Sequence, residues 1–421
     1  MLKVVDLRAW GEPPEPAGLV IAPEVVATVR DILQRVRTEG DRALTDLTRV
    51  HDGADVAGRI RVGDDEIEAA TESLSGELRD ALAAMAERLR DLHTRQLPAA
   101  WEAERDGIRY GEVVRPLAVA GCYVPGGLAA YPSTVLMTAV PAAVAGVERI
   151  VVCTPPMADG SVPKMVLHAA HLAGVESVYR VGGAQAIAAM AFGTETVPRV
   201  DKIVGPGNVW VTAAKREVAG IVGVDALAGP TELVVVADET SDAAVLAADL
   251  VAQAEHAPDA RAFVVSMDEG LADRLERRLD EAVQGSPRRD VVAAALADAA
   301  VLLVASPEQA ASAVDALAPE HLQVLTSDPR WFLNRVRSFG AAFLGPHTPV
   351  SFGDYGVGSN HVLPTMGTAR FSSGLRAADF VTVASVVEAS PEAPARFGPE
   401  IERVAIAEGL PGHARASEVR R

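Results

Sequence analysis

Two polar pairs in the second half of the chain carry side chains suited to acid–base or metal chemistry. Gln253 and His256 are three residues apart, so on a helix they lie side by side, one turn apart. Glu320 and His321 are adjacent, at a junction that leads into a predicted strand. Histidine is suited to proton transfer near neutral pH, and glutamate can act as a base or activate a water molecule. Taken alone, each pair has a simpler explanation. His256 could interact with the dipole at a helix C-terminus, and Glu320 and His321 could be solvated residues of a turn.

Three further residues could belong to the same site. Asp354 stands in a loop between glycines, which suits a carboxylate ligand on a bending backbone, although an Asx-turn has the same pattern. Glu408 and His413 lie near the C-terminus, where chains are usually disordered. Any three such residues with a substrate would form an open catalytic site for Zn²⁺, and Mn²⁺ or Co²⁺ would also suit the donors. The candidates span residues 253–413, so only the fold could bring them together.

Three glycine turns share one design, in which a strand is followed by glycines and then by a helix start. They are Val124-Pro-Gly-Gly127, Val181-Gly-Gly-Ala-Gln185 and Val204-Gly-Pro-Gly-Asn208. Glycine lets a ligand approach the backbone, and a helix N-terminus favours anions. Such turns also occur as ordinary tight connections. The standard dinucleotide fingerprint is absent, because Trp210 stands where its third glycine belongs, so spacing alone does not establish NAD.

The elements that must position these residues are strand-like and helical runs, which alternate over most of the chain. Helical periodicity covers 23–97, and the alternation then runs through 117–237 and 242–344. This pattern predicts an α/β fold with mostly parallel sheets covered on both faces. Residues 345–376 form a long Gly/Pro/Ser-rich segment, which is typical of a functional loop. We expect residues 1–17 to be an arm outside the core, and the tail to contain a Pro-rich hinge at 390–399 and a final helix from about Glu400.

Composition excludes several classes of function. The 421 residues carry a net charge of −18, which argues against a nucleic-acid backbone as partner but not against a small anionic cofactor. Cys122 and Cys153 lie in apolar runs and are expected to be buried, and without a C-x-x-C pair a thiolate zinc site is excluded. The N-terminus is not that of a signal peptide. The apolar stretch 135–147 is shorter than the about 20 residues that span a bilayer, so we expect a cytoplasmic protein without a membrane partner.

The chain resembles the histidinol dehydrogenase family. The resemblance rests on segments in family order from about 115 to 380, and the tail matches through Glu408 and His413. The segments are GCYVPGG, STVLMTAVPA, VGGAQAIAAMAFGTETVPRVDKIVGPGNVWV, DALAGPTELVVVAD, LVAQAEHAPD, APEHLQV, FGDYGVGSNHVLPT and ARFSSGL. The long central block is highly specific, whereas the first hundred residues match in helical character more than in motif.

The resemblance implies a fold of two incomplete Rossmann-like domains with parallel-type sheets, an N-terminal helical arm and a dimer-swapped C-terminal tail. The implied divisions are an arm at 1–17, a first domain from 18–122 and 231–376, an NAD domain at 123–230, and a tail at 377–421. The implied partner is a second copy of the chain, to whose active site Glu408 and His413 would be supplied in trans.

The resemblance also implies an activity, the NAD-dependent four-electron oxidation of L-histidinol to L-histidine through L-histidinaldehyde, the last steps of histidine biosynthesis. Two NAD molecules would be used per turnover. His321 would be the base for the alcohol proton, and Glu320 would activate the water that attacks the aldehyde. One Zn²⁺ per subunit would anchor the substrate, with the implied ligands Gln253, His256, Asp354 and His413. The implied substrate contacts are Thr231, Gln253, His256, Glu320, His321, Asp354, Glu408 and His413, and the implied NAD contacts are Tyr123, Gln185 and Asn208.

Three other interpretations stay open at this point. A paralogous zinc- and NAD-dependent dehydrogenase could oxidise another small hydroxy compound, although retention of Glu408 and His413 favours an imidazole substrate. A zinc-dependent hydrolase could use Glu320 to activate a metal-bound water. A binding protein without activity would have no need for the complete ligand set. One departure from the family pattern is Thr231, where many members have serine, but the hydroxyl is retained.

Overall fold

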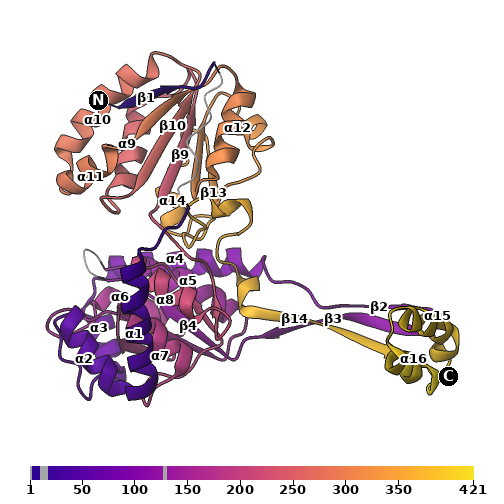
Figure 1. Cartoon of the computed structure of the whole chain (residues 1–421). Helices are drawn as coiled ribbons and strands as arrows, with labels where there is room; N and C mark the ends of the chain where they lie inside the picture. The colour runs from indigo at the N-terminus through magenta and orange to yellow at the C-terminus, as the bar shows by residue number, and fades with distance from the viewer. Residues whose placement is uncertain (1, 10–17, 127–129) are drawn as a thin grey trace.

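The computed structural model describes residues 2–9, 18–126 and 130–421, which form two parallel sheets and one projecting antiparallel arm (Figure 1). The expectations for residues 10–17 of the N-terminal arm and for Gly127 of the first glycine turn lie outside these residues. The predicted α/β class with parallel sheets is confirmed. None of the described helices is both long and apolar enough to cross a membrane.

Sheet B, within residues 119–224, is parallel with strand order β6-β5-β4-β7-β8. Its strands are β4 (Val119–Tyr123), β5 (Arg149–Thr154), β6 (Ser177–Arg180), β7 (Lys202–Val204) and β8 (Gly223–Val224). Helices cover both faces of the sheet, because the side chains on both faces of its strands are apolar. Helices α5 (Pro132–Val144) and α6 (Lys164–Leu172) pack on one face, and α7 (Gly183–Phe192) and α8 (Val209–Val218) pack on the other.

The four N-terminal helices also pack on sheet B. They are α1 (Pro23–Glu39), α2 (Asp41–His51), α3 (Asp64–Ser73) and α4 (Gly76–Thr94). The first two join the face of α7 and α8, and the others join the face of α5 and α6. The expected first domain grouped residues 18–122 with 231–376, which contain most of sheet A, whereas these helices pack on sheet B. Periodicity reveals an apolar stripe such as Val29, Leu33 and Val36, but it does not say which sheet covers that stripe.

Sheet A is parallel with strand order β1-β11-β10-β9-β12-β13. Its strands are β1 (Lys3–Asp6), β9 (Glu232–Ala237), β10 (Arg261–Ser266), β11 (Ala300–Leu303), β12 (His321–Leu325) and β13 (Ala341–Leu344). Helices α9 (Ala243–Ala254) and α10 (Leu271–Gly285) pack on one face, and α12 (Pro307–Leu317) and α13 (Pro329–Leu333) pack on the other. Helix α11 (Arg289–Leu296), which the sequence pattern did not predict, packs near the C-terminal end of α9.

The expectation that residues 1–17 form an arm outside the core is wrong for β1. Lys3 to Asp6 pair in parallel with Ala300 to Leu303 at the edge of sheet A. Leu7 then enters the core beside α12. A four-residue edge strand has too little apolar periodicity to be recognised from the sequence, because its pairing partner lies almost 300 residues away.

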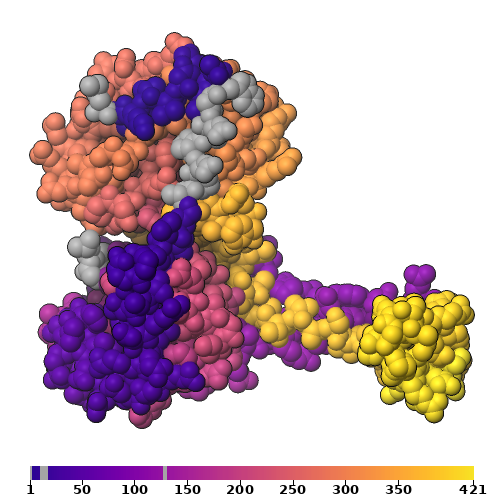
Figure 2. Space-filling view, in the orientation of Figure 1, coloured from indigo at the N-terminus to yellow at the C-terminus, as the bar shows by residue number. Residues whose placement is uncertain are grey.

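The C-terminal tail leaves the body along an antiparallel arm. Strand β14 (Val381–Ala389) pairs with β3 (Ile108–Pro116), which pairs with β2 (Trp101–Arg105). At the far end of this arm lie α15 (Ala393–Ala407) and α16 (Pro411–Glu418), well separated from both sheets (Figures 1 and 2). The expected hinge at 390–399 is wrong, since most of it is the start of α15. Pro394 lies in the first turn of that helix, where a missing N–H costs no hydrogen bond.

Candidate active site

The buried carboxylate of Glu320 is the centre of the candidate site. Glu320 precedes β12, and Thr231 precedes the neighbouring strand β9, so parallel pairing places the two residues side by side. The Thr231 hydroxyl donates to Glu320 Oε2 over 2.5 Å, and the Glu232 N–H donates to the same oxygen over 2.9 Å. Gln253 Nε2 in turn donates to the Thr231 hydroxyl over 2.8 Å. Two of these hydrogen bonds hold one Glu320 oxygen directly, and the third orients the Thr231 hydroxyl that donates to it.

Burial sets the protonation of Glu320. It raises the pKa of the Glu320 carboxyl to about 7, since a charge in a low-dielectric interior is poorly solvated. The hydrogen bonds from Thr231 and Glu232 and the charge of His256 lower this pKa, while the charge of Asp354 raises it. A carboxyl group poised near neutral pH is suited to take a proton from water.

His321 lies beside Glu320 with both ring nitrogens unused. The side chain is 3% exposed, and neither nitrogen has a hydrogen-bond partner among the described residues. Its Nδ1 is 3.6 Å from Glu320 Oε2, which is too long for a hydrogen bond. Burial lowers the pKa of His321 to about 4, although the charge of Asp354 acts in the opposite direction. A neutral buried imidazole without partners calls for an explanation, and a bound substrate would supply one.

Gln253 and His256, at the end of α9, have an amide oxygen and a ring nitrogen that are available to bind a metal. His256 Nδ1 lies 3.1 Å from the carbonyl of Ala252 and 3.2 Å from that of Gln253, so this nitrogen carries the proton. The Nε2 atom is then left as an acceptor, the form in which histidine binds a metal. Because Gln253 Nε2 donates to Thr231, the amide oxygen of Gln253 remains available.

Asp354 ends the short helix α14 (Ser351–Asp354), in the loop predicted to be functional. Its charge acts on the pKa of both Glu320 and His321, which groups it with them. Its carbonyl is 3.2 Å from His361 Nδ1, and His361 Nε2 is 3.2 Å from the Thr134 hydroxyl on α5. His361 thus ties the Asp354 loop to the sheet B side of the molecule. The burial of His361 lowers its pKa to about 4.

Glu408 and His413 lie away from the other candidates. Both line an apolar groove formed by α15 and α16. Figure 1 shows these two helices at the far end of the arm. Among the described residues of this single chain, no three His, Cys, Asp or Glu side chains are arranged to hold a metal. The body of one chain brings together Gln253, His256 and Asp354 around Glu320 and His321, but it does not bring His413 to them.

The candidate nucleotide residues share one edge of sheet B. Tyr123 ends β4, Gln185 begins α7 after β6, and Asn208 precedes α8 after β7. The Gly183 N–H donates to the Tyr123 hydroxyl over 3.1 Å, and burial raises the pKa of that hydroxyl to about 12. Gln185 is buried, and Asn208 caps α8 by accepting the N–H groups of Trp210 and Val211. The carboxyl edge of a parallel sheet is where ligands usually bind.

Sequence reasoning missed Glu232, His361 and Thr134. Glu232 reads as the first residue of an apolar strand, yet burial raises its pKa to about 7 beside Arg261. His361 stood within the predicted loop, but nothing in the spacing indicated contacts with Asp354 and α5. A charged residue at the start of a strand that is otherwise entirely apolar was the one available signal for Glu232.

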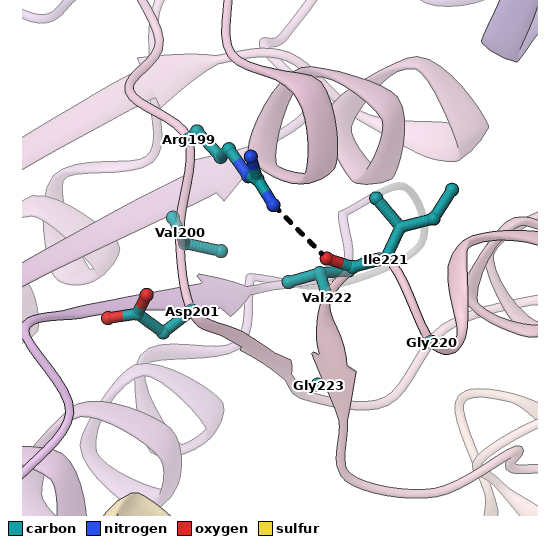
Figure 3. Close-up of a pocket in the computed structure, with 7 residues that line it drawn as sticks. All are labelled: Arg199, Val200, Asp201, Gly220, Ile221, Val222 and Gly223. Atoms are coloured by element: carbon teal, nitrogen blue, oxygen red, sulfur yellow. Dashed lines mark hydrogen bonds between the residues drawn. The ribbon is translucent and has the colours of Figure 1, made fainter.

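A separate surface pocket lies at the opposite edge of sheet B, where β7 and β8 begin (Figure 3). Arg199 crosses it and donates to the carbonyl of Ile221 over 3.3 Å. None of the candidate residues lines this pocket, so it is a surface feature separate from the candidate site.

Comparisons with known proteins cover nearly the whole chain. The family model described as histidinol dehydrogenase matches residues 20–421, which include every candidate residue. The chain is 46% identical to histidinol dehydrogenase of Halalkalibacterium halodurans over 93% of each chain. It is 47% identical to that of Caulobacter vibrioides, over 94% of this chain and 92% of the relative. Its structure is similar to the crystal structure of histidinol dehydrogenase from Elizabethkingia anophelis, with a TM-score of 0.94, 34% identity and coverage of 100% of this chain and 98% of that one.

Proposed function

The chain belongs to the histidinol dehydrogenase family, and we propose that it oxidises L-histidinol to L-histidine through L-histidinaldehyde. It would act on this small molecule as an NAD-dependent oxidoreductase of histidine biosynthesis, using two molecules of NAD per turnover. The observation that carries the proposal is the buried pair of Glu320, fixed through one oxygen, and His321, with both ring nitrogens unused. A cytoplasmic location, where soluble NAD is available, is part of this proposal.

The two residues of this pair have different tasks. His321 is neutral and accepts the proton of the substrate hydroxyl in the first oxidation. Glu320 accepts a proton from the water that adds to the aldehyde, and Thr231 and the Glu232 N–H hold it in place for this step. The chemistry that bound NAD would supply is acceptance of one hydride in each oxidation, and two such oxidations would remove four electrons. Tyr123, Gln185 and Asn208 would contact the dinucleotide at the edge of sheet B.

The donor set fits one zinc ion per subunit. Gln253 offers an amide oxygen, His256 a ring nitrogen and Asp354 a carboxylate, which are donors that Zn²⁺ accepts without thiolate. His413 of a second copy would complete the protein ligands, with Glu408 beside it as a substrate contact. When bound, zinc would anchor the imidazole and amine of the substrate. The remaining proposed substrate contacts are Thr231, Gln253, His256, Asp354, Glu320 and His321.

An assay of the number of NADH formed per histidinol consumed tests this proposal. With L-histidinol and NAD, absorbance at 340 nm is expected to rise until two NADH have formed per histidinol consumed. After dialysis against a metal chelator we expect no rise in absorbance, because the substrate then lacks its anchor. Added Zn²⁺ should restore the rise. A preparation shown to be metal-free by elemental analysis yet fully active would overturn the zinc assignment. Absence of NADH in the metal-loaded protein would overturn the proposed reaction itself.

The two half-reactions should also differ in their response to acid. Glu320, with its pKa raised to about 7, loses its ability to act as a base as the pH falls below that value. His321, with its pKa lowered to about 4, stays neutral down to much lower pH. Aldehyde oxidation is therefore expected to decline below about pH 7 while alcohol oxidation is maintained. Initial rates with histidinol and with histidinaldehyde, measured across the same pH range, check this, and identical acidic limbs would contradict it.

A further inference from the structure

The turn after β7 is pressed against the end of the neighbouring strand. Gly205 has φ of +115°, and a Cβ there would lie 2.1 Å from the carbonyl oxygen of Tyr123. Only glycine fits such an approach and such a φ. This turn leads directly to Asn208 and the start of α8, so its conformation determines where the proposed nucleotide residues stand.

A buried ion pair holds both polar groups of Gly205. Asp225 Oδ2 accepts the Gly205 N–H over 2.7 Å, and Lys215 Nζ donates to the Gly205 carbonyl over 2.5 Å. Lys215 Nζ and Asp225 Oδ1 are themselves 2.5 Å apart, and the two side chains are only 3% and 6% exposed. The charges thus face each other and the backbone of the turn. Lys215 is too enclosed to bind a ligand phosphate itself.

The same pair connects α8 with the start of the segment that leads from sheet B to Glu320. Lys215 is on α8, seven residues and about two turns after the helix cap Asn208, so the two lie on one side of that helix. Asp225 begins the segment 225–231, which passes to sheet A. Along this segment the Ala228 carbonyl accepts the hydroxyl of Thr212 on α8 over 2.7 Å, and the Gly229 N–H donates to Thr365 over 2.7 Å. The segment ends at Thr231, which holds Glu320.

We propose that Lys215 and Asp225 are positioning residues for the dinucleotide. They hold the Gly205 turn in the shape that receives NAD, and their ion pair links α8 to the start of segment 225–231. This inference rests on the proposed use of NAD at the edge of sheet B. It goes beyond that proposal because neither residue touches the cofactor: both act through the backbone of Gly205.

Direct binding measurements test the proposal. Lys215→Met and Asp225→Asn remove one charge each, and each is expected to weaken NAD binding by tenfold or more, since a small displacement of a binding group is enough for such a loss. The half-saturating concentration of L-histidinol should stay within about threefold of the starting protein, because neither residue contacts a proposed histidinol residue and Thr231 is held separately by Gln253 and Glu320. NAD binding is measured by titration calorimetry on holoenzyme whose folding is checked by circular dichroism.

Lys202→Met is the matched control. Lys202 is on β7, the strand that leads into the Gly205 turn, and forms a partly buried ion pair with Asp379, but it does not contact Gly205. We expect it to bind NAD as the starting protein does. Lys215→Gln is the second variant, which keeps a neutral donor and should recover part of the lost affinity. Full NAD affinity in folded Lys215→Met, equal losses in Lys202→Met, or failure of both Lys215 variants to fold would overturn the proposal. If the starting protein itself does not bind NAD, the proposed function fails instead.

Discussion

Replacement of Glu320 by glutamine is expected to reduce aldehyde oxidation by about 10²–10⁴-fold while alcohol oxidation falls much less. Glutamine keeps the size of the side chain and can still accept from Thr231 and the Glu232 N–H, but it cannot take a proton from water. Only the second oxidation needs an activated water. Single-turnover rates with histidinol and with histidinaldehyde as starting compounds measure the two steps separately.

Two companion variants make this result interpretable. His321→Asn should damage both oxidations, because the imidazole is the proposed base for the alcohol proton and is expected to assist the second step as well. Glu232→Gln is the control, since Glu232 is also buried with a pKa raised to about 7 but hydrogen bonds to Arg261 and the Met366 N–H. It should affect the two steps alike. Equal damage to both steps by Glu320→Gln would remove the water-activating role assigned to Glu320.

A mixture of two inactive variants is expected to regain about a quarter of the starting activity if the tail acts in trans. One variant is His321→Asn and the other is His413→Ala, and each homodimer should be nearly inactive. In a heterodimer one site then carries both substitutions and the other carries neither. Random pairing makes half of the dimers heterodimers, and each has one intact site of two.

The position of the tail motivates this experiment. The groove that contains Glu408 and His413 is formed by α15 and α16. These helices lie at the end of the β2–β3–β14 arm, away from α9 and α14, which carry Gln253 and Asp354 (Figure 1). The groove is flanked by exposed apolar side chains, of which Ile401 is 50% and Val404 58% exposed, as expected for a face that another copy covers. The chains are mixed by denaturation and refolding, with differently tagged copies to confirm heterodimers. Heterodimers without recovered activity would show that His413 serves its own chain or none.

Much of the fold could be predicted because apolar runs report burial directly. The predicted helical region 23–97 contains α1 to α4, and the predicted alternation through 117–237 and 242–344 contains every strand of sheet B and all of sheet A except β1. The errors have one origin, which is that partners distant in sequence leave no local trace. Strand β1 pairs with a strand almost 300 residues later, and α1 to α4 pack on a sheet whose strands come later. Pro394 misled because it occupies the first turn of α15, and Pro399 lies inside that helix although proline usually ends helices.

The candidate site was predictable as a set of residue types, but not as an arrangement. Glu320 and His321 stood out as adjacent polar residues before an apolar strand. The threonine hydroxyl that links Gln253 to Glu320 could be located only when β9 and β12 lay side by side. Lys215 and Asp225 gave no signal at all, because a lysine and an aspartate ten residues apart usually lie on the surface.

The pairing of β1 with β11 constrains the order in which the sheets can form while the chain is being synthesised. All five strands of sheet B have been synthesised once residue 224 has emerged, and helices α1 to α4 precede them. Residues 3–6 are synthesised before every other described strand, yet they have no partner until residues 300–303 exist. Strand β1 therefore stays unpaired while an entire neighbouring sheet can assemble. It can join the edge of sheet A only after β9, β10 and β11 have been made, so the order of the strands along this sheet differs from the order of their synthesis.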